Sequence, residues 1–212
     1  MICSVALKVT GAAVPSGLDG YEWRRLCTSH KGASRDLCES LASVARRICS
    51  SYVDPIPIAP LLVCRLITMD KCPGVRPIGI GDTTHRIISK AVLTIGGPDI
   101  QQVAGHRQMC GGHISGVKAA VHATRFAFES EESEAVILVD ATNPFINTYQ
   151  SPTDLYVDGE VILSQEGTTQ GDPLAMPMYG LVAIPLIRGL GGACKQVWYA
   201  DDSAAVGKIH QL

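Results

Sequence analysis

The residues Ala135-Val-Ile-Leu-Val139 form a continuous apolar run that ends in an acidic residue, Asp140. A short run of β-branched and aliphatic side chains predicts a β-strand, and the lack of polar alternation predicts a central strand that is buried on both faces. Asp140 then stands at the end of that strand, where the backbone holds its carboxylate rigidly. The run therefore predicts a sheet that is covered on both faces, with Asp140 as a candidate functional residue at the end of one strand.

Strands and helices alternate around this run. The dipeptide Asp158-Gly159 is a strong hairpin signal and predicts a hairpin over 154–165. Strands at 196–200 and 204–206 predict a second hairpin with Asp201-Asp202 at its tip. Apolar spacing and capping residues predict helices over 21–30, 36–52, 83–93, 116–130 and 172–181, an extended stretch over 61–80 and a glycine-rich loop over 96–116. The pattern predicts an α+β fold around a mostly antiparallel sheet.

The composition limits the class of protein. The chain has 212 residues, of which 46% are hydrophobic, enough for one large domain or two small subdomains and too many for a disordered chain. Eight cysteines without a CxxC pair favour reduced thiols inside a cell over a disulfide-stapled secreted module. The longest apolar stretch, 56–69, is interrupted by Pro57, Pro60 and Arg65, and no signal peptide stands at the start. We expect an intracellular protein, in cytoplasm or nucleus, with no transmembrane segment and no membrane partner.

The charges are divided unevenly along the chain. Residues 1–126 carry 15 basic and 8 acidic residues, whereas residues 127–212 carry 3 basic and 12 acidic residues, and the whole chain has a net charge of −2. An acidic cluster over 129–134 explains part of this asymmetry as an exposed helix end. The rest predicts a basic region that binds a polyanion and an acidic region that binds cations.

Three carboxylates are candidates for one cation site. Asp140 ends a strand, and Asp201 and Asp202 stand at the tip of a hairpin. Three carboxylates held close together repel one another unless a cation lies between them. A pair of Mg²⁺ ions about 4 Å apart would relieve this repulsion and promote in-line phosphoryl transfer. Taken alone, Asp-Asp at a hairpin is ordinary turn chemistry, and only the surrounding residues favour a metal site.

The acidic region carries three segments that resemble the palm motifs of reverse transcriptases. Tyr199-Ala-Asp-Asp202, after Val197-Trp198, resembles the family's YxDD hairpin. Leu138-Val-Asp-Ala-Thr-Asn-Pro-Phe145 resembles the first palm motif, which is an apolar strand, an Asp and an aromatic residue five positions later. The segment 165–174, Gln-Glu-Gly-Thr-Thr-Gln-Gly-Asp-Pro-Leu, resembles the second motif, in which a Gln-Gly turn opens a helix.

The basic region adds two weaker likenesses. Lys71, followed by Arg76-Pro-Ile78, resembles the fingers segment that grips the incoming triphosphate, and the segment 14–19 resembles the entry segment of retrotransposon enzymes. All these segments occur in the family's order and cover nearly the whole chain. The chain is therefore similar to a fragmentary reverse transcriptase of a retrotransposon, which implies a fingers-like region over 1–126 and a palm-like region over 127–212.

The resemblance implies an RNA-directed DNA polymerase core that transfers a nucleotide from a dNTP to a primer 3′-hydroxyl on an RNA or DNA template. Asp140 and Asp201 would be shared by two Mg²⁺ ions, for which Mn²⁺ can substitute, with Asp202 beside them and the Ala141 carbonyl as a supplementary ligand. The substrate-binding residues implied in the same way are Lys71 and Arg76 on the triphosphate, Phe145 under the sugar, and Gln170 and Gly171 at the templating pair.

The sequence also departs from the family's pattern. Only residues 146–155 separate Phe145 from the hairpin strand, which is too short for the crossover helix of such palms, and Ser151-Pro152 would break a helix there. We read this as an internal deletion near 146–155. The sequence stops ten residues after Asp202, so we also expect that the thumb is absent, that it is supplied by other parts of a polyprotein if at all, and that the chain alone is not a processive polymerase.

Two other functions compete with the polymerase core. A catalytically dead remnant of a retroelement would at most bind nucleic acid. Another palm enzyme, such as a nucleotidyl cyclase, would have a Gly-Gly-acidic hairpin in place of Tyr199-Ala-Asp-Asp202, and an RNA-dependent RNA polymerase would have an acidic residue near Phe145.

Other polar residues have simpler explanations. Asp172 is expected to cap a helix, and His85 is expected to be structural or exposed. Cys110-Gly-Gly-His113 is only half of a zinc site.

Overall fold

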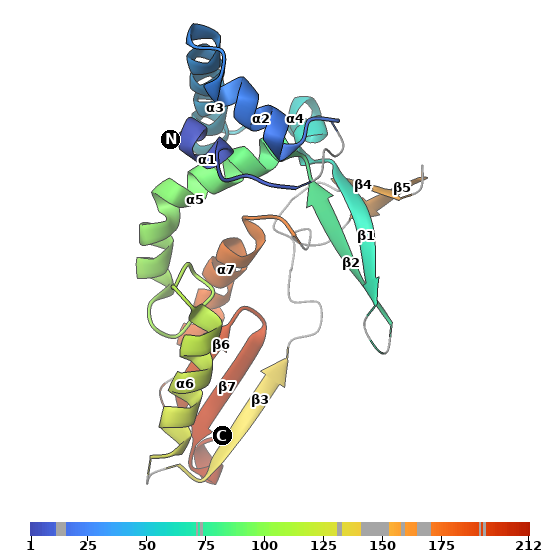
Figure 1. The fold of residues 1–212 in the computed structure, drawn as a ribbon. Helices are drawn as coiled ribbons and strands as arrows, with labels where there is room; N and C mark the ends of the chain where they lie inside the picture. The colour runs from blue at the N-terminus through green and yellow to red at the C-terminus, as the bar shows by residue number, and fades with distance from the viewer. Residues whose placement is uncertain are drawn as a thin grey trace. The chain divides into compact units, whose positions relative to one another are not determined.

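The computed structural model describes residues 1–11, 16–70, 72, 74–130, 133–140, 153–157, 160–164, 171–190, 192 and 194–212 (Figure 1). Contacts divide the chain into two compact units, Met1–Ile95 with Asn147–Ala175, and Gly96–Ile146 with Met176–Leu212. Each unit combines helices with strands, so the α+β class is confirmed. The division between 126 and 127 rests on charge and stays a prediction, as do the fingers and palm subdomains.

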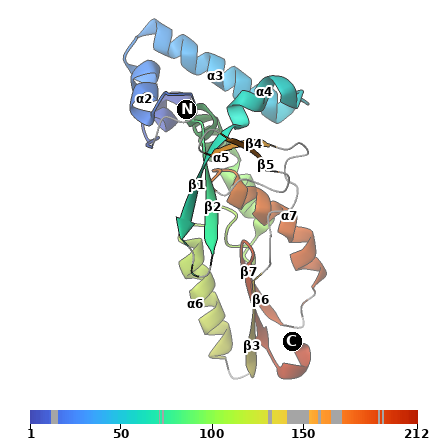
Figure 2. The ribbon, with the colours of Figure 1, turned by 90° about the vertical axis from the view of Figure 1, so that its right-hand side faces the viewer.

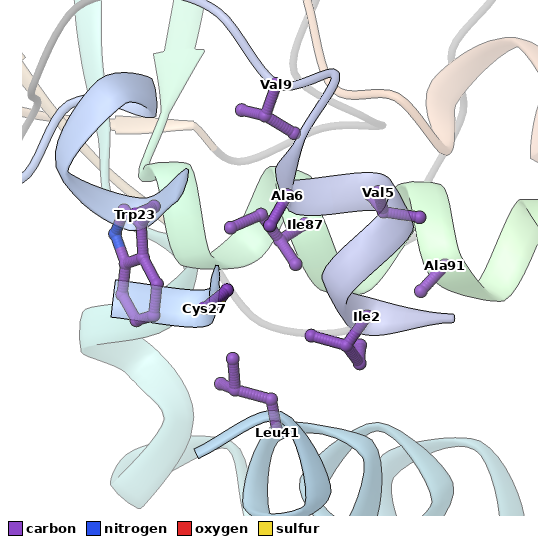
Figure 3. Close-up of a cluster of buried hydrophobic side chains, with 9 residues drawn as sticks. All are labelled: Ile2, Val5, Ala6, Val9, Trp23, Cys27, Leu41, Ile87 and Ala91. Carbon is purple, nitrogen blue, oxygen red and sulfur yellow. The ribbon is translucent and has the colours of Figure 1, made fainter. Parts of the chain in front are cut away.

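Helices build the core of the first unit. It is formed by α1 (Ile2–Ala6), α2 (Gly20–Thr28), α3 (Gly32–Ser50) and the first half of α5 (Thr83–Ala104). A capping box starts α2, because an Asp19 carboxylate oxygen accepts a hydrogen bond from the Glu22 amide and a Glu22 carboxylate oxygen accepts one from the Asp19 amide. Nine buried residues from these helices and from the loop after α1 pack together: Ile2, Val5, Ala6, Val9, Trp23, Cys27, Leu41, Ile87 and Ala91 (Figure 3).

A short helix, α4 (Pro55–Leu62), occupies a segment for which the sequence analysis predicted no helix. Asp54-Pro55, which follows α3, starts this helix. The Asp54 carboxylate accepts a hydrogen bond from the Ile56 amide at 3.0 Å, and Pro55 has no N–H that would be left unpaired in the first helical turn.

The first unit also contains a four-stranded sheet with the order β2-β1-β4-β5. Its strands are β1 (Cys64–Asp70), β2 (Val75–Gly81), β4 (Thr153–Val157) and β5 (Glu160–Ser164). The pairs β1–β2 and β4–β5 are antiparallel. The sequence predicted a hairpin for the second pair, and for the first it predicted only an extended stretch. The pair β1–β4 is parallel, with Cys64 opposite Leu155, so the hairpin 154–165 extends this sheet (Figure 2).

Helix α5 is longer than predicted. It continues through Gly96, Gly97 and Pro98 to Ala104, where a glycine-rich loop was expected from residue 96. Tertiary contacts explain the difference, because the following loop packs back on the helix. His113 contacts the Gly105 carbonyl at 2.9 Å and the Gln101 side chain at 3.2 Å. Such contacts outweigh the low helix propensity of glycine, which costs about 1 kcal/mol per residue.

The second unit is built on a three-stranded antiparallel sheet with the order β3-β7-β6 (Figure 1). Its strands are β3 (Ala135–Asp140), β6 (Lys195–Tyr199) and β7 (Asp202–Gly207), and its helices are α6 (Gly116–Phe128), most of α7 (Ala175–Gly189) and a short 3₁₀ helix, η1 (Ile209–Gln211). Helix α6 contacts both β6 and β7. The described residues therefore form two separate sheets in place of the single sheet predicted.

The burial predicted for the run 135–139 is wrong. Strand β3 pairs with β7 along one edge and has no second partner among the residues that the structure describes. Leu138 is 75% exposed and Val139 50% exposed. An uninterrupted apolar run thus does not distinguish a central strand from an edge strand that is only partly covered.

Among the residues that the structure describes, no helix combines the length and the apolar character needed to cross a membrane.

Candidate metal-binding and nucleotide-binding site

The second unit brings two of the predicted carboxylates face to face. Asp140 is the last residue of β3, Asp202 is the first residue of β7, and the two are direct partners in the antiparallel ladder. Directly opposite residues in such a ladder have Cβ atoms about 5 Å apart and share one face of the sheet. Two carboxylates from segments 62 positions apart therefore lie at one end of one sheet.

Asp201 lies in the turn next to this pair. Tyr199 and Asp202 are paired residues of β6 and β7, so Ala200 and Asp201 alone form the loop. Ala200 has φ +53°, a left-handed conformation that costs about 1–2 kcal/mol for a residue with a Cβ. Two-residue hairpins need positive φ values, and Gly or Asn usually supplies them. In this hairpin, formed by β6, β7 and the loop Ala200-Asp201 and called the acidic hairpin below, an alanine supplies the positive φ.

The charges of the three acids act on one another. The pKa of the Asp202 carboxyl is raised by partial burial and then by the negative charges of Asp201 and Asp140. The pKa of the Tyr179 hydroxyl is also raised, first by burial and then by the negative charge of Asp201. The Asp201 carboxylate therefore lies within electrostatic reach of both Asp202 and a tyrosine of α7.

The donor chemistry of this cluster suits a hard divalent cation, because Mg²⁺ prefers carboxylate oxygens. In the described part of the chain, no group of three or more His, Cys, Asp or Glu side chains is arranged to hold a metal ion. The opposed pair of Asp140 and Asp202, with Asp201 in the adjoining turn, therefore provides the carboxylates without enclosing an ion. Ala141, the expected supplementary ligand, lies outside the described residues.

The carboxylate pair borders an apolar groove between α6 and the sheet. The groove has a volume of about 530 Å³, and Asp140 and Asp202 are among the residues that line it. It is also lined by Val117 and Val121 of α6 and by Leu138 of β3, each of which is at least half exposed. Four residues at helical spacing along one side of α6 line this groove: Val117, Val121, Thr124 and Phe128.

The predicted nucleotide-binding residues fall in the first unit. Gly171 has φ +110°, and a Cβ built on it would lie 2.5 Å from the Gly79 carbonyl oxygen of β2. Arg76 belongs to the same strand, opposite Met69 of β1. The Gly171 turn and the strand that carries Arg76 are therefore in backbone contact. Lys71, Phe145 and Gln170 lie outside the described residues, so their predicted roles stay predictions.

A buried polar contact anchors the Gly171 turn. The Asp172 carboxylate accepts a hydrogen bond from the Leu174 amide at 2.8 Å, in agreement with its predicted capping role. Its other oxygen lies 3.3 Å from Nε2 of His85, and Ser89 Oγ lies 3.3 Å from the same nitrogen. The sequence predicted that His85 is structural or exposed. The structure buries it, and the sequence did not indicate its partner, which is 87 positions away.

Sequence analysis also missed Gln108. It is fully buried, and its side-chain amide contacts the backbone of Ala200 in the acidic hairpin. The only signal in the sequence was a polar residue within a glycine-rich segment, which gave no reason to connect it with residue 200.

Comparisons with known proteins do not show a family. No protein family and no curated protein matches the chain. Among solved structures, it is similar to a chain of a partial Cas6-RT-Cas1–Cas2 complex and to a chain of a Cas6-RT-Cas1–Cas2 complex, each with 13% identity and a TM-score of 0.38. Each likeness covers 97% of this chain, but 36% of the first chain and 23% of the second. With these values, the likeness establishes neither a family nor an activity.

Proposed function

We propose that this chain is the catalytic core of an RNA-directed DNA polymerase from a retroelement. The observation that carries the proposal is the pairing of Asp140 with Asp202 at one end of an antiparallel sheet, with Asp201 in the adjoining turn. The pairing joins the two segments that resemble the first palm motif and the YxDD hairpin, which lie far apart in the sequence.

In this proposal, Asp140, Asp201 and Asp202 hold two Mg²⁺ ions, or Mn²⁺ in their place, with the Ala141 carbonyl as a further ligand. The ions would supply the positive charge that two reacting polyanions need, and would lower the pKa of the primer 3′-hydroxyl. The carboxylates fix the position of that charge. The new bond forms between the primer 3′-oxygen and the α-phosphorus of the dNTP, while the bond from that phosphorus to the β-phosphate oxygen breaks and pyrophosphate leaves.

The nucleotide is proposed to bind through residues of the first unit. Lys71 and Arg76 neutralise the triphosphate, Gln170 and Gly171 contact the templating pair, and Phe145 stacks under the sugar and excludes a 2′-hydroxyl. The contact of Gly171 with Gly79 supports part of this proposal, since it brings Gly171 to the strand that carries Arg76. The excess of basic residues over 1–126 supports binding of a template and primer.

Single-nucleotide addition to a primer on an RNA template, with Mg²⁺ or Mn²⁺, tests the proposal. We expect the chain to add one dNTP and the Asp201→Asn variant to add none, because Asn keeps the shape and removes the charge. Asp36→Asn is the matched control, because Asp36 is an exposed acid on α3 whose side chain is 71% accessible. Equal incorporation by Asp201→Asn and the wild type would refute the proposed site. Salt-sensitive nucleic-acid binding without any incorporation would favour the dead remnant.

A further inference from the structure

The acidic hairpin is held by a side chain from a distant part of the sequence. Gln108 is 0% exposed, and its Oε1 accepts a hydrogen bond from the Ala200 amide at 3.0 Å. Its Nε2 donates a hydrogen bond to the Ala200 carbonyl at 3.3 Å. One side-chain amide thus pairs with both backbone polar groups of the single residue at which the hairpin bends.

The backbone on either side of Gln108 fixes this contact. The Met109 amide donates a hydrogen bond to the Trp198 carbonyl, and the Trp198 amide donates one to the Arg107 carbonyl, both at 2.7 Å. Residues 107–109 therefore pair with β6 and place the Gln108 side chain level with the turn. On α7, Gly180 leaves room for it, because a Cβ there would lie 3.5 Å from Gln108 Cγ and 3.0 Å from Cys110 Sγ.

We propose that Gln108 is a positioning residue for the metal-binding carboxylates, which it orients by holding Ala200 in the left-handed conformation. This inference rests on the proposed function. Ala200 immediately precedes Asp201, so the φ and ψ angles of Ala200 set the direction in which Asp201 and Asp202 leave the turn. Gln108 itself contacts neither carboxylate in the described hydrogen bonds and acts through the backbone.

Only an amide side chain of this length can serve both groups of Ala200. Glutamine carries a donor and an acceptor, whereas a carboxylate accepts only and an aliphatic side chain does neither. Gln108→Met keeps the length and removes both hydrogen bonds to the Ala200 backbone in a buried site. Gln108→Glu adds a negative charge close to Asp201 and cannot donate to the Ala200 carbonyl.

The test measures Mn²⁺ binding to the full chain by electron paramagnetic resonance and hydrogen exchange at the Ala200 amide. We expect Gln108→Met to weaken Mn²⁺ binding about 10- to 100-fold, as the loss of groups that orient metal ligands does elsewhere, and to accelerate exchange at Ala200. Adding Ala200→Gly should restore much of the Mn²⁺ affinity, because glycine adopts positive φ without support. Ile187→Val, a buried change on α7 away from the hairpin, controls for a general loss of stability.

The outcomes separate the inference from the proposed function. If the wild type binds Mn²⁺ and Gln108→Met binds it equally well, or if Ile187→Val weakens binding as much, the inference is wrong and the proposed function stands. Failure of Ala200→Gly to rescue a weakened site also overturns the inference. If the wild type binds no Mn²⁺, the proposed function fails, and exchange at Ala200 alone decides whether Gln108 holds the turn.

Discussion

His85 Nε2 lies 3.3 Å from the Asp172 carboxylate, and both side chains are at least 90% buried. Asp172 is thereby fixed to α5 as well as to its own turn, so the segment that follows Gly171 has two independent attachments. We expect His85→Leu to lower the free energy of unfolding by about 1–3 kcal/mol, because a buried carboxylate loses a polar partner.

Urea unfolding measures this effect, and His106→Leu is the matched control because His106 is exposed. Equal stability of the two variants would show that the His85–Asp172 contact contributes nothing measurable.

The stability of the first unit should depend on pH through Asp82. Burial alone would raise the pKa of this carboxyl, but hydrogen bonds from Ser16 and Thr84 outweigh burial and the pKa is lowered. A folded pKa below the unfolded value means that the contribution is complete above the unfolded pKa and is lost as the pH falls through the folded pKa. Asp82→Asn should cost about 1 kcal/mol near pH 6, and the difference should shrink below about pH 4.

Denaturant unfolding of Asp82→Asn and the wild type at pH 6, 4 and 3 measures this difference. A difference that stays constant over that range would contradict the assignment of the pH dependence to Asp82.

The opposed carboxylates of Asp140 and Asp202 should destabilise the fold in the absence of a divalent cation and bind a cation when it is present. Like charges directly opposite in a ladder destabilise it by a few tenths of a kcal/mol when solvent screens them. Without divalent cations, Asp140→Asn should therefore raise the melting temperature slightly. With Mn²⁺, the wild type should gain stability and Asp140→Asn should gain none. Thermal unfolding with and without Mn²⁺ checks both effects, and equal stabilisation of the two proteins would place the cation elsewhere.

Two glycines should respond in opposite ways to replacement by alanine. Gly171→Ala should destabilise the fold by about 1–3 kcal/mol, because its φ of +110° disfavours a Cβ and the Gly79 carbonyl occupies the space. Gly96→Ala should stabilise α5 by about 0.5–1 kcal/mol, because a Cβ there meets no atom within 4 Å. Unfolding free energies measure both, and a stabilising Gly171→Ala would contradict the backbone contact.

The exposure of β3 gives a further prediction. Leu138→Ser should change the free energy of unfolding by less than about 0.5 kcal/mol, because the side chain is 75% exposed. Ile187→Ala, at a buried position on α7, should cost about 2–5 kcal/mol in the same measurement. A large loss from Leu138→Ser would mean that β3 is covered after all.

Local patterns predicted the strand that ends in Asp140 and the hairpin around Asp201, because strand periodicity and turn residues act over a few neighbouring positions. The exposure of β3 and the extension of α5 through Gly96 were not predictable in that way, since both depend on what packs against these segments. The contacts of His85 with Asp172 and of Gln108 with Ala200 join residues 87 and 92 positions apart. A single sequence carries no spacing rule for such pairs.

Gln108 forms hydrogen bonds with the backbone of Ala200 and none with its side chain, which has a consequence for the sequences that the hairpin accepts. Gln108 does not contact the side chain at position 200, but that position is buried. A saturation library there should therefore retain Gly along with Ala, because glycine adopts positive φ without strain and needs no space for a side chain. A library at position 108 should retain little besides glutamine, because its side chain supplies both the donor and the acceptor that pair with Ala200. The residue that most restricts sequence change at the tip of the acidic hairpin would then be Gln108, which lies outside the motif Tyr199–Asp202.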